Sequence, residues 1–157
     1  PLILWHEEIH QKADDININN DEGMMVEGEL AVPVVKITHK IEVVTELAVK
    51  LRPHQREGVQ FLFDCTMGRK SFNGQGCILA DDMGLGKTLM SITIIWTLMN
   101  QGFVAGQTAV RKVIVVCPTS LVGNWDNEIR KWVGDKCNTF AVKSEPQKII
   151  KEFVVVL

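Results

Sequence analysis

The chain has 157 residues, of which 46% are hydrophobic and 23% are charged, and its formal net charge is −2. These proportions are ordinary for a globular protein, and the length suits one domain of common size. They argue against a disordered tail or a fibrous repeat. No run of residues is long or apolar enough to span a bilayer, and no secretory signal opens the chain, so we expect no membrane partner.

The sequence begins with Pro1 rather than Met, so we expect it to be a piece of a longer polypeptide. Residues 1–52 carry ten acids against five bases, whereas residues 53–157 carry nine acids against twelve bases. A mildly basic second part is compatible with nucleic acid, but it is also the pattern of a solvated surface. The cysteines have no C-x-x-C spacing, which favours free thiols in a reducing compartment over zinc or disulfides. They are Cys65, Cys77, Cys117 and Cys137.

Residues 1–42 show little regular pattern and are predicted to form an irregular N-terminal segment. Residues 14–22 are rich in Asp and Asn, a composition typical of loops and disordered segments. Short strands are expected at residues 31–36 and 41–44 within and just after this segment. Thr45 is predicted to cap a short helix that ends before Pro53.

Helices are predicted at regular intervals from residue 43 onward. Pro53 suits the first turn of a helix, and a second helix is expected from about residue 87 to residue 100. Ser120 has the side chain of an N-cap and opens a third helix. Trp125 and Trp132 recur at the helical spacing of its apolar residues, so we predict core positions for them rather than base stacking.

Strands are predicted between these helices. Residues 77–80 and residues 138–142 are candidates, and residues 113–117 form the continuous apolar run of a buried parallel strand. A helix near residues 146–152 and the start of another element at residues 153–157 continue the pattern. Alternating β and α units imply an α/β fold with a parallel sheet flanked by helices.

The most informative stretch follows the predicted strand at residues 77–80. It ends in Gly-x-Gly-Lys-Thr and opens the next helix, the order of strand, glycine-containing loop and helix N-terminus that binds phosphate. Lys87 can reach the β- and γ-phosphates, and the Thr88 hydroxyl can hold Mg²⁺, so ATP and Mg²⁺ are the expected cofactors. The first Gly of the pattern G-x-x-x-x-G-K-[ST] is replaced by Asp81. The predicted nucleotide-binding loop is Asp81, Asp82, Met83, Gly84, Leu85, Gly86, Lys87 and Thr88.

Gln55 lies upstream of this loop in the sequence Arg-Pro-His-Gln. A Gln amide can pair with N6 and N7 of adenine through two hydrogen bonds. A single Gln is more often a solvated helix residue, and it is the position ahead of a phosphate loop that favours adenine recognition.

Three segments together resemble a known family, the SWI/SNF-type superfamily-two helicase-like DNA translocases. Residues 51–62 resemble its Q motif, residues 78–89 its motif I, and residues 113–125 its motif Ia region. In this family Asp stands where other phosphate loops have Gly, as Asp81 does here. Asp82 departs from the usual Glu and keeps its charge, so we expect little effect.

The resemblance covers roughly residues 43–143, and two features indicate the branch that acts in homologous recombination. These are the Arg-Pro-His-Gln form of the first motif and the Ile-Trp-Thr-Leu sequence at residues 95–98. The family would make residues 43–157 the incomplete first RecA-like ATPase lobe of a nuclear enzyme that moves along double-stranded DNA during repair. A recombinase filament is implied as a partner, and the oligomeric state is left open.

The resemblance also implies residue roles. Gln55 would recognise adenine, Lys87 would stabilise charge on the γ-phosphate, and Thr88 would position Mg²⁺. Thr119 and Ser120 would contact the DNA backbone, although helix capping explains this pair equally well.

The family's acidic motif, which binds Mg²⁺ and activates water, is expected after residue 157, as is the second lobe. Residues 21–23 have a sequence similar to part of that motif, but no apolar strand precedes them, so we do not predict a catalytic role for them. These 157 residues alone are therefore expected to bind ATP without turning it over. Two other functions stay open: a non-catalytic nucleotide-binding or regulatory module derived from such an enzyme, and a small-molecule phosphotransferase. The second would need a lid or an arginine cluster that we do not find.

Overall fold

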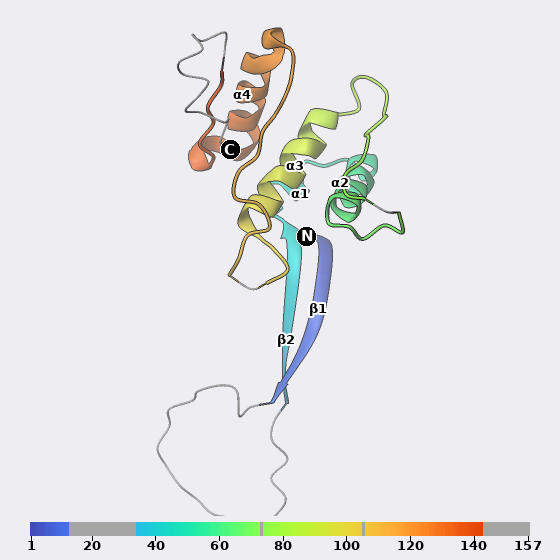
Figure 1. Ribbon diagram of the computed structural model, residues 1–157. Coiled ribbons are helices and arrows are strands. Elements are labelled where there is room, and N and C mark those ends of the chain that lie inside the picture. Colours follow the sequence, from blue (N-terminus) through green and yellow to red (C-terminus); the bar gives the residue numbers. More distant parts are fainter. Residues whose placement is uncertain (13–33, 73, 105, 143–157) are drawn as a thin grey trace, which may run out of the picture.

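The computed structural model describes residues 1–12, 34–72, 74–104 and 106–142 (Figure 1). Within these residues, no helix has the length and apolar character needed to cross a membrane. The elements in chain order are β1 (Leu2–Lys12), β2 (Val34–Val43), α1 (Thr45–Ala48), α2 (Pro53–Thr66), α3 (Lys87–Asn100), α4 (Thr119–Val133) and the 3₁₀ turn η2 (Gly134–Lys136).

Strands β1 and β2 form a long antiparallel hairpin that extends away from the helices (Figure 1). The register runs from Leu2 opposite Val43 to Lys12 opposite Val34. The prediction of an irregular N-terminal segment is therefore wrong for β1 and β2, and the short strands expected at 31–36 and 41–44 are replaced by one strand. Cross-strand pairing between segments distant in sequence stabilises this hairpin, and local periodicity does not report such pairing. The loop expected at residues 14–22 lies outside the described residues.

The helices begin largely where their local signals predict. α2 starts at Pro53 and α3 spans Lys87–Asn100, as expected. α1 starts at Thr45, but Val44 occupies the N-cap position, so Thr45 is not the cap. α2 and α3 approach closely at Gly58, where an added Cβ would lie closer than 3.0 Å to the sulfur of Met90.

Helix α3 lies between two apolar cores. Its Thr93 and Thr97 are fully buried, and their hydroxyls donate to the carbonyls of Leu89 and Thr93 at 2.8 Å, which satisfies both polar groups. The first core joins α3 to the base of the hairpin, α1 and α2. Its buried residues are Leu4, Ile41, Val43, Leu47, Ala48, Leu51, Val59, Leu62, Phe63, Leu89, Met90, Ile94 and Leu98.

The second core lies between α3 and α4. Its buried residues are Ile92, Ile129, Val133 and Cys137. Trp125 and Trp132 are half-buried and pack against this core, which confirms their prediction as core residues.

The sheet of the described residues has two antiparallel strands, and the predicted parallel sheet is not formed there. Residues 77–80, 113–117 and 138–142 belong to neither strand. A strand needs neighbours for its N–H and C=O groups, and no described segment pairs with these three. The expected elements at residues 146–152 and 153–157 lie outside the described residues.

Candidate nucleotide-binding site

The predicted phosphate loop connects the extended residues 77–80 to the N-terminus of α3. Gly84 and Gly86 have φ angles of +87° and +88°, in the left-handed region that glycine adopts without strain. Gly86 is also the residue from which α3 starts, and no side chain caps this helix end. The loop therefore turns sharply and leaves the positive end of the α3 dipole open to an anion.

Gly86 is also needed for close approach between the two predicted motifs. A Cβ at this position would lie closer than 3.0 Å to Nε2 of Gln55. The Gln55 side chain is 7% exposed, and its Nε2 donates to the carbonyl of Leu85 at 3.1 Å. α2 and the phosphate loop are thus joined directly, through the residue that was predicted to read adenine.

The other end of the Gln55 amide is held by its own helix. The backbone N–H of Arg52 donates to Oε1 of Gln55 at 2.9 Å, the return bond of a capping box. These bonds orient the amide and still leave it one N–H and one acceptor lone pair. Gln55 can therefore hold the loop and offer both kinds of group to a ligand.

His54 was missed by the sequence reasoning. Its Nε2 lies 3.2 Å from the carbonyl of Leu85, the same atom that Gln55 contacts. Its place in the sequence gives no signal of this contact, because adjacent residues of a helix do not face each other, and the shared contact depends on how the loop lies against α2. His54 and Gln55 together bind one loop carbonyl.

Lys87 reaches back across the loop. Its Nζ donates to the carbonyls of Asp81 and Asp82 at 2.7 Å and 2.8 Å, and an ammonium has three donors, so one remains. None of the described backbone hydrogen bonds outside regular elements is donated by residues 81–88. The loop therefore presents backbone N–H groups and a fixed ammonium, the groups that bind phosphate.

The remaining loop residues contribute backbone rather than side chains. Asp81, Asp82, Met83 and Leu85 are exposed, and Met83 is 96% exposed. Thr88 is half-buried in the first turn of α3, directly after Lys87. Its place beside the ammonium suits a metal held by the phosphates.

A cavity of about 490 Å³ adjoins the loop between α2 and residues 78–81. This volume lies within the range of small-molecule sites, about 300–1,000 Å³. Its lining combines ring, aliphatic and charged groups: His54, Glu57, Gly58, Phe61, Ile78, Leu79, Ala80, Asp81 and Leu85.

Thr119 and Ser120 lie apart from this loop in the chain, as the first two residues of α4. Both are exposed, and the N-cap position is Pro118, without a side-chain capping bond. The prediction of Ser120 as N-cap is therefore wrong: the N-cap lies two residues earlier, at Pro118. Among the described hydrogen bonds, none joins this pair to residues 81–88.

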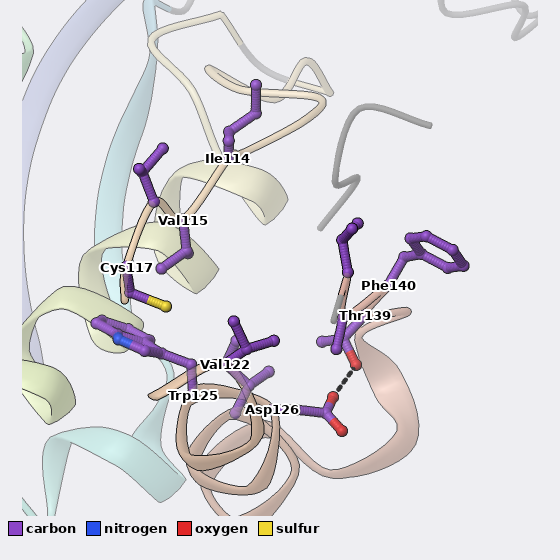
Figure 2. Close-up of a pocket in the computed structure, with 12 residues that line it drawn as sticks. Ile114, Val115, Cys117, Val122, Trp125, Asp126, Thr139 and Phe140 are labelled. Carbon is purple, nitrogen blue, oxygen red and sulfur yellow. Dashed lines mark hydrogen bonds between the residues drawn. The ribbon is translucent and has the colours of Figure 1, made fainter. Parts of the chain in front are cut away.

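A second cavity, of about 510 Å³, lies between α4 and residues 114–117 and 139–142 (Figure 2). Its lining is largely apolar, and Trp125 and Val122 of α4 face Val115 and Cys117 across it. The hydroxyl of Thr139 donates to Asp126 at one side. The lining of this second cavity includes neither the glycine loop nor the Lys87 ammonium of the first site.

The chain belongs to the SNF2-related family, since the SNF2-related domain matches residues 54–155, well over half of the sequence. It is 60% identical over 143 residues to Protein CHROMATIN REMODELING 25 of Arabidopsis thaliana, covering 90% of this chain and 13% of that protein. It is 46% identical over 143 residues to DNA repair and recombination protein RAD54 of Oryza sativa subsp. japonica, covering 90% and 12%.

A third relative is DNA repair protein rhp54 of Schizosaccharomyces pombe, 50% identical over 108 residues that cover 67% of this chain and 13% of that protein. The aligned part of the chain thus spans 12% to 13% of these relatives. The predicted resemblance to the SWI/SNF-type family and its recombination-repair branch is confirmed.

Proposed function

We propose that this chain is the ATP-binding portion of an ATP-dependent double-stranded DNA translocase that acts in homologous recombination and repair in the nucleus. The observation that carries the proposal is the joint between Gln55 and the loop at Leu85 and Gly86, with Lys87 fixed on the same loop. This contact keeps the amide that we propose reads adenine beside the loop that we propose binds phosphate. In the whole enzyme, residues 77–80 and 113–117 would be strands of the parallel sheet of a RecA-like lobe.

ATP and Mg²⁺ fit the residues present. The N–H groups of residues 81–88 and the α3 N-terminus would hold the phosphate oxygens, and the ammonium of Lys87 would turn from the carbonyls of Asp81 and Asp82 towards the γ-phosphate. The Thr88 hydroxyl would hold the metal. Bound Mg²⁺ would offset the phosphate charge as it develops.

Adenine recognition would fall to Gln55. Its free N–H and lone pair complement N7 and N6 of adenine, while its bonds to Arg52 and Leu85 keep the amide oriented. The neighbouring cavity of about 490 Å³, lined by His54 and Phe61, offers room for a base and a ribose.

DNA would be the macromolecular partner, and Thr119 and Ser120 would contact its backbone. Their exposure at the start of α4 supports this role, because helix N-termini bind phosphate oxygens. Relatives named for DNA repair and recombination support DNA as the substrate. A recombinase filament as a further partner is implied by the family resemblance alone.

Binding of a fluorescent ATP analogue to the 157-residue chain with Mg²⁺ tests the nucleotide site. Lys87→Ala removes a charge-assisted contact of about 1.5–3 kcal/mol, so affinity should fall about 10- to 100-fold. Lys50→Ala is the matched control, since Lys50 is an exposed lysine near the end of α1, outside the site. Equal affinity of the Lys87→Ala and unsubstituted chains would overturn the assignment.

We also propose that these 157 residues alone do not hydrolyse ATP, because the acidic water-activating motif of the family is not among the motifs recognised in them. Phosphate release should stay at background with and without double-stranded DNA. DNA-stimulated release that Lys87→Ala abolishes would refute this second proposal and leave the first intact.

A further inference from the structure

Two of the four cysteines lie together although residues 66–76 separate them. Cys65 is in the last turn of α2 and is 1% exposed, whereas Cys77 is exposed at the start of the extended segment that leads into the phosphate loop. Oxidants in solution can therefore reach Cys77, and through it Cys65. This pairing cannot be read from the spacing of the cysteines.

The backbone holds the two residues in place. The carbonyl of Cys65 accepts two hydrogen bonds, from the N–H of Gly68 at 3.3 Å and from the N–H of Gly76 at 3.2 Å. These bonds close the loop between the cysteines at its base. The N–H of Gly76, the residue before Cys77, is bonded to the carbonyl of Cys65, and the Cys65 side chain acts on the Cys77 thiol, so the two cysteines are neighbours before any reaction.

We propose that Cys65 and Cys77 are a redox pair that forms an intramolecular disulfide with a low-molecular-weight disulfide such as oxidised glutathione. The Cys77 thiolate attacks the glutathione disulfide, forms a mixed disulfide and releases one glutathione thiolate. The Cys65 thiolate then attacks the Cys77 sulfur and releases the second glutathione thiolate. The two protons lost by the protein thiols end on the two released glutathiones, and the protein loses two electrons to them.

The disulfide would tie the segment that enters the phosphate loop to the helix that carries Gln55. Desolvation is the largest effect that raises the pKa of Cys77, and the neighbouring Cys65 thiol is the second. Little Cys77 thiolate is therefore present near neutral pH, and thiol–disulfide exchange is slow. The pair therefore rests as thiols and responds to sustained oxidation. This inference does not depend on the proposed function, because its test uses no nucleotide.

Two exposed basic residues make the test direct. Arg69 and Lys70 lie between the cysteines, so trypsin cuts inside the loop and separates peptide 57–69 from peptide 71–87. The whole native chain is treated with oxidised glutathione, the remaining thiols are alkylated, and the digest is analysed by mass spectrometry without reduction. We expect the two peptides to stay linked and to separate on reduction.

Cys117→Ser is the matched control that should keep the linked pair, and Cys77→Ser should lose it. A second comparison uses only the unsubstituted chain, so it does not depend on whether a variant folds. The yield of the 65–77 linkage should be several-fold lower when the same oxidation is done on the chain unfolded in urea. Equal yields in native and unfolded chains would overturn the proposal. Glutathione retained on Cys77 of the native chain, or linkage of Cys77 mainly to Cys117, would overturn it as well.

Discussion

Replacing Gly86 by Ala tests the contact between Gln55 and the loop at Leu85 and Gly86, which joins the two segments proposed to bind nucleotide. The substitution places a methyl group in a left-handed residue, at a cost of about 1–2 kcal/mol. The same methyl group would displace the Gln55 amide from the Leu85 carbonyl. One neutral hydrogen bond is lost and a buried amide is left short of a partner, which adds about 1–3 kcal/mol. We expect a total loss of about 3 kcal/mol in the free energy of unfolding.

Gly84→Ala provides the control, because Gly84 has nearly the same φ, +87°, and nothing lies within 4 Å of its added Cβ. It should therefore cost only the backbone strain of about 1–2 kcal/mol. Urea unfolding, followed by the fluorescence of the four tryptophans, gives both free energies.

A double-mutant cycle completes the measurement. In a Gln55→Ala background the methyl group at position 86 meets no amide, so Gly86→Ala should cost no more than Gly84→Ala does. The expected coupling between positions 55 and 86 is about 1–2 kcal/mol. Equal costs for the two glycine substitutions in the unsubstituted chain, or full additivity with Gln55→Ala, would refute the reasoning.

Three further predictions concern the cores and the titrating groups. Phe63→Ala should cost about 3–5 kcal/mol in urea unfolding because Phe63 is fully buried, whereas Phe61→Ala, at a 40% exposed position of the same helix, should cost under about 1 kcal/mol. The indole N–H of Trp132 donates a hydrogen bond of 2.8 Å to the Glu128 carboxylate. This bond is the largest of the effects that lower the pKa of Glu128 from its ordinary value of 4.5. Stability from Glu128 is thus present above pH 4.5 and lost as pH falls through its folded pKa, so the cost of Glu128→Gln should shrink in urea titrations at successively lower pH. Burial raises the pKa of Cys137, which is 7% exposed, so alkylation followed by mass spectrometry should label it slowly in the native chain and rapidly in urea; equal rates would contradict this.

The helices could be predicted where a local signal marks them. Pro53 and the Gly-Lys-Thr sequence that opens α3 each mark a helix start within a few residues, and α2 and α3 begin there. The hairpin could not be predicted in this way. Its register joins Leu2 to Val43, and such long-range pairing leaves little trace in local composition.

The candidate site was predictable in its parts and not in its assembly. Residue types and spacing indicate Gln55 and Lys87 separately, but the contact of Gln55 with Gly86 depends on how α2 packs against α3. The meeting of Cys65 with Cys77 has the same origin, because loop closure at the Cys65 carbonyl brings the thiols together. Tertiary packing, which a single sequence does not display, decides both contacts.

The apolar run at residues 113–117 has a consequence for the chain in solution. Val113 and Val115 pack against the second core, whereas Ile114 is 57% exposed and Val116 is 91% exposed. One side of this segment is therefore an uncovered apolar ribbon with unpaired backbone groups. Molecules of the chain should associate through it, so that the midpoint of unfolding rises with protein concentration by mass action. Dilution, or a charge at position 116, should remove that dependence.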